Sequence, residues 1–293
     1  MFQPDVLRWK CCTPHPFWDG SRGYALRHKG EIAAFGCVVP CRFTTGSGDV
    51  AGCNVIDWAA SKAVPGAGIG LYRHIQSLTS AMINIGGSAD ARRVLPAIGF
   101  AVGTELRHYT RVLRPLHHMR QAGRLDWKTP LRLARDYLEL ARSAPAARSA
   151  LSVGCQQVVC ARTPESIAYV LACPAARMEA RDLDGGGFLL SRVGGECRIA
   201  DLWIRSPDSH DWAAAYSAAT RAALADPETT HVTAAASQQL RTEALRLAGF
   251  RHTHSEPVFV FDPHHRLGDY SALVLSLLEN DAFYWSGSAA HAG

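Results

Sequence analysis

The segment Val64-Pro65-Gly66-Ala67-Gly68-Ile69-Gly70-Leu71 joins a strand signal, Gly52–Ala59, to a helix signal. In the helix signal, apolar residues recur at steps of four, three and four, which places them on one face of an amphipathic helix. A glycine-rich turn between a strand and a helix presents backbone N–H groups at the positive end of the helix dipole, where phosphate groups bind. We therefore predict a phosphate-binding turn. The apolar face of its helix consists of Leu71, Ile75, Leu78 and Met82.

Two common phosphate-binding loops do not fit these glycines. A P-loop continues into Gly-Lys-Ser/Thr, whereas Gly70 is followed by Leu71-Tyr72. A dinucleotide-binding fingerprint has the form G-x-G-x-x-G, whereas the spacing here is Gly66-x-Gly68-x-Gly70, and no clear second strand ending in Asp or Glu follows. Nicotinamide and flavin binding are therefore disfavoured, and a turn with no ligand remains the alternative.

The first half of the chain alternates strand and helix signals, which indicates an α/β (α+β) fold with mixed sheets flanked by helices. β-forming residues flank a Lys29-Gly30 turn and predict a hairpin. A later helix stops at Gly99, a typical C-cap. The expected elements besides the glycine turn are strands Tyr24–Arg27, Glu31–Pro40, Met82–Ile85 and Leu106–Leu113 and helix Ala89–Ile98.

The second half repeats this order. The pairs Gly99-Phe100 and Gly249-Phe250 lie 150 residues apart, and each ends a helix that a serine precedes, Ser88 or Ser237. The shared order favours a duplicated fold. The expected elements are strands Gly187–Arg192, Cys197–Ile204, His231–Ala236 and Val258–Asp262 and helices Trp212–Leu224 and Gln239–Ala248.

Length and composition agree with two globular units. The chain has 293 residues, 47% hydrophobic and 19% charged, a balance that excludes a disordered chain. We predict a first domain that contains the glycine turn over 1–115, a helical linker over 116–150, a degenerate copy of that domain over 151–285 and a flexible tail over 286–293. No apolar run reaches the ~18 residues that cross a bilayer, and no signal peptide is apparent, so we expect a cytoplasmic protein.

The cysteines and the charge predict neither a metal nor a nucleic-acid site. The nine cysteines lack paired CxxC spacing, and we expect buried free thiols that pack as small hydrophobic groups. A net charge of +5 is spread along the chain, which suits an anionic small molecule and does not form a nucleic-acid footprint.

The ordered set of signals resembles the GNAT superfamily of acyl-CoA-dependent N-acyltransferases. In that family a strand leads into a loop of the form Arg/Gln-x-x-Gly-x-Gly/Ala, then a helix, a strand and a second helix that ends in Gly-Phe. The match covers about residues 24–113 and, more loosely, 187–262. The whole arrangement is similar to bacterial acyltransferases that modify amino sugars of surface polysaccharides and to the double-GNAT aminoacyltransferases of the peptidoglycan bridge.

The resemblance implies acetyl-CoA or another acyl-CoA as co-substrate. The pyrophosphate would lie on the backbone amides of the loop, and a backbone N–H near the end of the strand would polarise the thioester carbonyl. No metal is implied. The residues that would bind the co-substrate are Trp58, Ala59, Ala60, Gly66, Ala67, Gly68, Ile69 and Gly70.

The sequence departs from the family at three points. Pro65 stands where the family carries Arg or Gln, and Leu95 and Leu245 stand where a tyrosine often protonates the leaving thiolate. The second half has no glycine loop, so we expect that it does not bind CoA. Tyr109 or solvent would then have to supply the proton.

Transfer to an amine also needs a group that takes up the amine proton near neutral pH. Asp57 is the best-placed candidate because it lies on the strand next to the expected thioester, with a structural carboxylate as the alternative. Glu105 and His108 lie on or near a strand that should neighbour it. The predicted catalytic residues are Asp57, His108 and Tyr109.

These observations predict an acyltransferase that moves an acetyl or other short acyl group from acyl-CoA to an amine, such as an amino sugar. The alternatives are a non-catalytic GNAT-like binding or regulatory protein and an aminoacyltransferase of the peptidoglycan-bridge type. The expected partners are a small-molecule or saccharide amine and no nucleic acid, with a homodimer left open.

Overall fold

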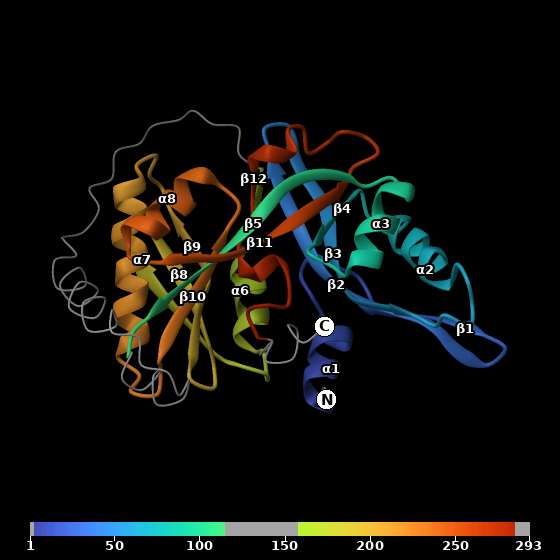
Figure 1. The fold of residues 1–293 in the computed structure, drawn as a ribbon, viewed down its shortest axis with the longest axis horizontal. Helices are drawn as coiled ribbons and strands as arrows, with labels where there is room; N and C mark the ends of the chain where they lie inside the picture. Colours follow the sequence, from blue (N-terminus) through green and yellow to red (C-terminus); the bar gives the residue numbers. More distant parts are fainter. Residues whose placement is uncertain (1–2, 115–157, 285–293) are drawn as a thin grey trace.

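One mixed sheet runs through both halves of the chain (Figure 1). The structure is a computed structural model that describes residues 3–114 and 158–284. The 12-stranded sheet has the order β12-β6-β2-β3-β4-β11-β5-β10-β9-β8-β7, and β1 pairs with β2. The strands are β1 (Gly23–His28), β2 (Glu31–Thr45), β3 (Gly48–Ala60), β4 (Ala81–Ile85), β5 (Ala101–Val112), β6 (Val158–Cys160), β7 (Arg177–Leu183), β8 (Gly186–Val193), β9 (Glu196–Ile204), β10 (His231–Ala236), β11 (Arg251–Phe261) and β12 (Leu273–Val274).

The two halves exchange their last strands. β11, from the second half, pairs antiparallel with β4 of the first half, and β5, from the first half, pairs antiparallel with β10 of the second. β5 and β11 also pair with each other and cross the middle of the molecule in Figure 1. On either side of this central pair a parallel pair follows, β3 with β4 and β9 with β10. The halves therefore repeat one topology and share one sheet.

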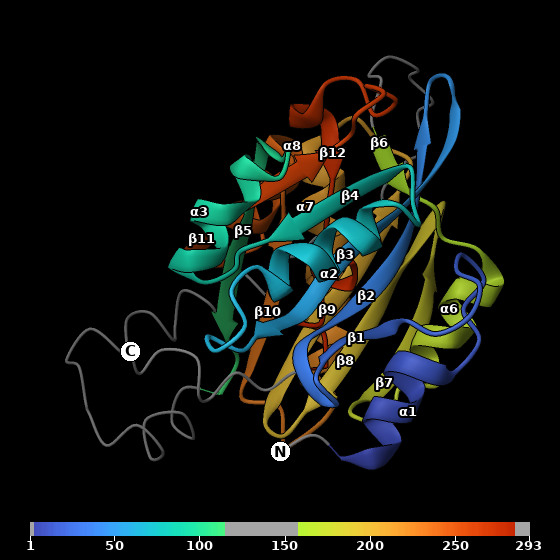
Figure 2. The same ribbon diagram turned by 90° about the vertical axis from the view of Figure 1, so that its right-hand side faces the viewer.

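Two helix pairs cover one face of the sheet. α2 and α3 lie over the strands of the first half, and α7 and α8 lie over those of the second (Figure 1). Side chains alternate between the faces of a strand, so the opposite face holds a third core. There α1 and α6 lie beside each other (Figure 2), and Trp9 stacks on Tyr169 at 4.8 Å. The helices are α1 (Pro4–Cys12), α2 (Ala67–Gln76), α3 (Ala89–Ala97), α6 (Pro164–Leu171), α7 (Ser209–Leu224) and α8 (Gln239–Leu247), with short 3₁₀ turns η1 (Tyr270–Ala272) and η2 (Leu277–Glu279).

The third core is built by both halves. Phe43 and Ile83 come from the first half, and Leu189, Val258 and Phe283 from the second, all of them nearly or fully buried. The segment 275–284 crosses this face, where Asn54 Nδ2 donates a hydrogen bond of 2.8 Å to the carbonyl of Glu279. The aromatic residues Phe283 and Tyr284, near the C-terminus, both pack in this core.

The expected α/β fold is confirmed, and the predicted strands and helices of both halves are present, although β2, β3, β5 and β11 extend beyond their predicted bounds by four to seven residues. The predicted helix after the glycine turn begins earlier, at Ala67, because the turn itself supplies its first residues, and it ends at Gln76. Leu78 and Met82, predicted on its apolar face, therefore lie outside it: Leu78 is exposed and Met82 is in β4. Of the eight described cysteines six are buried, as expected for thiols that pack as small hydrophobic groups. The predicted linker, 116–150, and the tail, 286–293, lie outside the described residues, and the domain boundaries stay a prediction. Among the described helices, none has the length and apolarity needed to span a membrane.

Candidate functional site

A β-bulge interrupts β3 at Asp57. Ile56 pairs with Cys37 and Ala59 with Phe35, so two residues of β3 oppose one residue of β2. Asp57 has φ 52°, a left-handed conformation that Asp tolerates better than most residues. A bulge rotates the backbone N–H groups beside it out of the ladder, which frees them for a ligand.

β3 and β4 separate next to this bulge. Their parallel pairing covers only Gly52–Asn54 against Ala81–Ile83. Beyond it the Asn84 side chain bridges the gap, donating to the carbonyl of Val55 at 3.2 Å and to the Tyr72 hydroxyl at 2.9 Å. Asn84 Oδ1 is buried and accepts no hydrogen bond from any described residue. The opening between the strands thus contains a buried acceptor that lacks a donor.

Helix α2 begins beside this opening with free donors. Gly66 is its N-cap with φ 82°, no side chain caps the helix, and its first turn has no acidic residue. Ala67 N–H donates to Val64 and Gly70 N–H to Gly66, whereas the N–H groups of Gly68 and Ile69 make no hydrogen bond with the described chain. These two donors lie at the positive end of the helix dipole.

Gly68 has a packing role as well. A Cβ there would lie 3.0 Å from both Ala60 Cβ and Trp58 Cζ2, so a side chain at this position would force α2 and the end of β3 to shift apart slightly. The Trp58 ring also meets Tyr72 edge to face at 4.8 Å, and its Nε1 is buried without a partner in the described chain. The predicted co-substrate residues Trp58, Ala59 and Ala60 are therefore brought next to the predicted loop.

The helix at the equivalent place in the second half has a different N-terminus. Asp208 caps α7 by accepting from the His210 N–H at 2.9 Å, and Asp211 lies in the first turn. Two carboxylates there satisfy and neutralise the helix end, which disfavours an anion. Of these two equivalent helices, α2 is the one whose N-terminus has no side-chain cap and no acidic residue in its first turn.

A cleft of about 970 Å³ opens beside the bulge and the strand opening. Its lining is rich in hydroxyl, amide and charged groups from both halves, and the segment that follows η2 forms one wall. Such a lining suits a polar, many-hydroxyl ligand better than an apolar one. The polar lining residues include Asp57, Asn84, His108, Thr110, Glu196, Arg198, Thr233, Thr253, His254, Glu256, Asn280 and Asp281.

His108 and Glu256 form a hydrogen-bonded pair in this cleft. His108, on β5, lies with its Nε2 2.8 Å from Glu256 Oε2, on β11. The hydrogen bond to His108 lowers the pKa of Glu256, against the opposing effect of burial. Glu256 is therefore a carboxylate at neutral pH that orients the His108 ring, and an imidazole held in this way is a suitable proton acceptor.

His254 completes a three-residue cluster. Its ligating atom and those of His108 and Glu256 lie within 4.8 Å of one another. The two imidazole rings are stacked, with centroids 4.2 Å apart and planes 9° from parallel. Because imidazole lone pairs lie in the ring plane, stacked rings do not direct two nitrogens at one ion, and we interpret the cluster as a proton-accepting group.

Asp57 lies at the same cleft but is paired. Its carboxylate contacts the ammonium of Lys10, which is 3% exposed and also lies 3.6 Å from Asp281. Burial raises the pKa of Asp281, partly offset by the Lys10 charge. A carboxylate that neutralises a buried cation is a poor proton acceptor, so this arrangement favours the structural alternative for Asp57.

The other predicted acid–base residues lie elsewhere. Tyr109 borders the cleft, but its side chain is fully buried in the core of the second half and its hydroxyl has no partner among the described residues. Glu105 pairs with Arg107 at 3.6 Å on the surface and does not line the cleft. The structure thus brings Asp57 and His108 to one cleft and leaves Tyr109 directed into a core.

Several site residues were missed from the sequence. Glu256 and His254 lie on β11, whose N-terminal part falls outside the predicted strand Val258–Asp262. The two-residue spacing of His254 and Glu256 could have signalled one polar face of a longer strand. Lys10 carries no such signal, because nothing local indicates that a lysine is buried.

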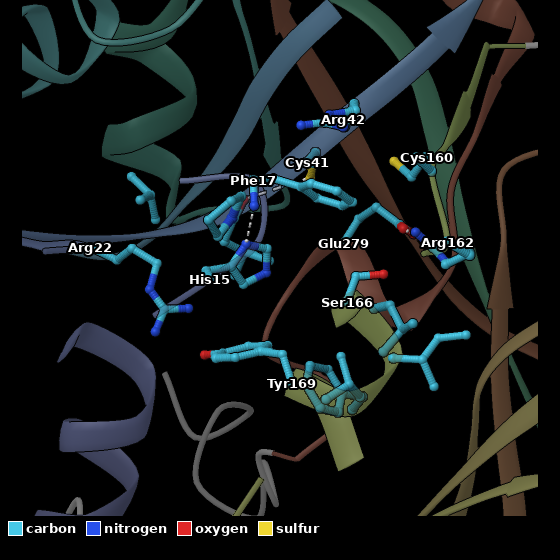
Figure 3. Close-up of a pocket in the computed structure, with 18 of the residues that line it drawn as sticks. His15, Phe17, Arg22, Cys41, Arg42, Cys160, Arg162, Ser166, Tyr169 and Glu279 are labelled. Atoms are coloured by element: carbon cyan, nitrogen blue, oxygen red, sulfur yellow. Dashed lines mark hydrogen bonds and ion pairs between the residues drawn. The ribbon is translucent and has the colours of Figure 1, made fainter. Parts of the chain in front are cut away.

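A second, smaller cavity of about 60 Å³ lies between α1, β2 and α6 (Figure 3). His15 meets the Tyr169 ring at 4.6 Å, and Arg42 lies over Phe17. Burial lowers the pKa of His15 to about 3, with Arg22 adding to the effect, so the ring is neutral. Arg162 is paired with Asp201 and Glu279, and this cavity is largely apolar.

The sequence matches no known family model and no curated protein. Solved structures with a related arrangement include the GCN5-related N-acetyltransferase from Kribbella flavida, at 14% identity and TM-score 0.48 over 82% of this chain and 60% of that one. The GCN5-related N-acetyltransferase from Anabaena variabilis has 12% identity and TM-score 0.48, and the match covers 82% of this chain and 62% of that one. Eis1 from Mycobacterium abscessus has 12% identity and TM-score 0.44, and the match covers 87% of this chain and 69% of that one. The chain thus spans 60% of the length of the first of these proteins.

Proposed function

We propose that the protein is a GNAT-type acyltransferase that moves an acetyl or other short acyl group from acyl-CoA to an amine. The observation that carries this proposal is the bulge at Asp57, beside the opening between β3 and β4 and the uncapped N-terminus of α2. Each feature alone is common, but together they offer donors for a diphosphate, a gap between strands and free backbone N–H groups within one short stretch.

In this proposal the pyrophosphate of CoA lies at the N–H groups of Gly68 and Ile69, with Lys62 exposed in the same loop. The pantetheine arm enters the opening between β3 and β4. Its amide groups would give the orphaned Asn84 Oδ1 the donor that it lacks. The thioester carbonyl then lies at the bulge, where a rotated N–H stabilises the oxyanion of the tetrahedral intermediate.

The amine occupies the polar cleft beside the bulge. Its nitrogen attacks the thioester carbonyl carbon, the C–S bond breaks, and CoA leaves as a thiolate that takes a proton from solvent. His108 accepts the proton that the attacking nitrogen loses, with Glu256 holding its ring. This assigns His108 as the base, Asp57 as a positioning residue for the bulge and Lys10, and no role to Tyr109.

An amino sugar is the acceptor that the cleft supports best. Its volume of about 970 Å³ exceeds what a small amine needs, and hydroxyl, amide and carboxylate groups on its walls match sugar hydroxyls and an ammonium group. We propose two GNAT-like halves, of which only the first binds acyl-CoA. In the second half, Asp208 caps the N-terminus of α7 and Asp211 adds a negative charge to its first turn, so this helix end would not bind a diphosphate. An aminoacyltransferase that uses a charged tRNA has no comparable support among these features.

The test is calorimetric titration of the full chain with acetyl-CoA, followed by transfer assays. We expect one site per chain, and release of free CoA thiol when an amino-sugar nucleotide is added. Binding without transfer to any amine in a panel of amino sugars would favour the non-catalytic alternative. Absence of binding to both acetyl-CoA and CoA would overturn the proposal.

A further inference from the structure

Two thiols at the end of α1 and in β2 lie in contact. The Sγ atoms of Cys11 and Cys37 are 3.3 Å apart, whereas a disulfide needs about 2 Å. Cys37 is fully buried and Cys11 is half-buried. One thiol of the pair is thus open to a small reagent, and the other lies directly behind it.

Gly23 makes this contact possible. It is the direct partner of Cys37 in the β1–β2 pairing, and the side chain of Cys11 lies over it. A Cβ at position 23 would be 3.0 Å from Cys11 Sγ and 3.8 Å from Cys37 Sγ. The missing side chain therefore forms the space in which the two sulfur atoms meet.

The charges around Cys11 favour its thiolate. The hydrogen bond from Cys37 and the cations Lys10 and Arg22 lower the pKa of Cys11 to about 7, against the effect of burial. Arg22 is 1% exposed, donates to the carbonyls of Trp9 and Thr13, and pairs with no carboxylate among the described residues. The Arg22 charge therefore favours a thiolate at Cys11, and the thiolate is the reactive form in thiol–disulfide exchange.

We propose that Cys11 and Cys37 are a reversible thiol–disulfide exchange site, which a low-molecular-weight disulfide such as oxidised glutathione closes to an intramolecular disulfide. The Cys11 thiolate attacks one sulfur of the small disulfide, whose S–S bond breaks and releases one thiol. Cys37 then loses its proton to solvent and attacks Cys11 Sγ, which releases the second thiol. Two protein thiols are oxidised, and one small disulfide is reduced to two thiols.

Formation of the Cys11–Cys37 disulfide would change the position of residues at the Asp57 bulge. Lys10 precedes Cys11 and pairs with Asp57, and Cys37 faces Ile56, the residue before Asp57. Drawing the two sulfur atoms together by about 1.3 Å, the difference between 3.3 Å and a disulfide bond, pulls the end of α1 toward β2 and shifts Lys10 relative to Asp57. We expect a changed acyl-CoA affinity in the oxidised protein, an effect that rests on the proposed function.

A second pair of thiols provides an internal comparison. Cys41 and Cys160 also interact, but both are buried, and the pKa of Cys160 is raised by its contact with Cys41 and by burial. Both pairs of thiols therefore interact. Only in the Cys11–Cys37 pair is one thiol partly exposed and its pKa lowered. Oxidation should select the Cys11 pair.

The experiment exposes the full chain to graded ratios of oxidised to reduced glutathione, blocks remaining thiols with iodoacetamide and maps the peptides by mass. The background is Cys12→Ser, because Cys12 is exposed and adjacent. We expect a Cys11–Cys37 disulfide that reduced glutathione reverses. In Cys37→Ser a glutathione adduct should remain on Cys11, and Cys11→Ser should form neither product.

The matched control is Gly23→Ala, which keeps both thiols and separates them. We expect it to slow the second step by about tenfold or more, so that the glutathione adduct accumulates. Alkylation of both Cys11 and Cys37 at every ratio, or preferential oxidation of Cys41 and Cys160, would overturn the proposal. Loss of acetyl-CoA binding in both redox forms would instead count against the proposed function and leave the exchange site standing.

Discussion

The pair His108–Glu256 shows how a single contact separates two roles. Glu256 stays ionised and holds the ring, whereas His108 accepts the proton. We expect His108→Gln to lower kcat by roughly 10²- to 10⁴-fold with little change in acetyl-CoA affinity, because it removes only proton transfer. Glu256→Gln should lower kcat less, since the imidazole remains. Steady-state kinetics and titration measure the two quantities.

The control for this pair is His252→Gln, an exposed histidine on the same strand that does not line the cleft. It should retain the activity of the parent protein. Equal losses in His252→Gln and His108→Gln would contradict the assignment. His108 could be selected from the sequence as a histidine on a strand, but Glu256 lies 148 residues away, and only the strand exchange brings the two together.

His15 makes a second prediction at this scale, about acid stability. Its folded-state pKa of about 3 lies below the ordinary value of 6.5, so between these values the unfolded chain binds a proton that the folded chain does not. Neutral His15 therefore makes its full contribution to the free energy of unfolding above pH 6.5. Below pH 6.5 the free energy of unfolding falls as the pH decreases, by up to about 1.4 kcal/mol per pH unit. Urea unfolding of His15→Gln between pH 7 and 4 should show a shallower decline, measured as a slope.

An exposed loop histidine supplies the comparison for that slope. His264→Gln, in the loop after β11, should leave the pH dependence unchanged. Identical slopes for the parent protein and His15→Gln would show that His15 is protonated in the folded state. The apolar environment in Figure 3, with Phe17 and Tyr169 against the ring, makes a neutral imidazole the expected form.

At the scale of an element, the N-terminus of α2 is the feature to test. Pro65 is exposed and directly precedes the N-cap. A carboxylate there would favour the helix dipole by about 0.3–1 kcal/mol and at the same time repel a diphosphate. We expect Pro65→Glu to weaken acetyl-CoA binding by about tenfold, because the new carboxylate repels the diphosphate. The midpoint of thermal unfolding should not fall, because the same carboxylate interacts favourably with the helix dipole.

Pro65→Gln is the matched control, because it has the same length without the charge. It should bind acetyl-CoA at least as well as the parent protein, since a side-chain amide can donate to a phosphate. Equal binding by the Glu and Gln variants would place the pyrophosphate somewhere else. Gly68 is unsuitable for this purpose, because any side chain there meets Trp58 and Ala60 and would disturb packing.

Elements with a strong local pattern were predictable from the sequence, and the others were not. The repeated strand–helix order and the two helices that end at Gly99 and Gly249 follow from apolar spacing and C-caps. α1 has a buried lysine on its inner face, which breaks the apolar period, and β7 is an edge strand of mostly charged, partly exposed residues. Their conformation comes from what they pack against, which a local pattern does not contain.

At the scale of the whole molecule, the exchange of β5 and β11 makes the two halves depend on each other. β11 forms ladders with β4 and β5 of the first half, so without it β4 would be an unpaired edge in the middle of the sheet. The partner of a strand is set by its whole surroundings and not by its own residues. The sequence could therefore indicate two similar halves but not that they share one sheet.

This dependence predicts what happens when the chain is cut between the halves. A protease site inserted between residues 115 and 157 would separate β5 from β10 and β11 covalently. We expect the two fragments to elute together at the size of the intact protein in native buffer and to separate only in denaturant, because each supplies a central strand to the other and both build the third core. Size-exclusion chromatography measures this, with the uncut variant as control. Fragments that elute apart in native buffer would mean that each half closes its own sheet, contrary to the pairing of β4 with β11.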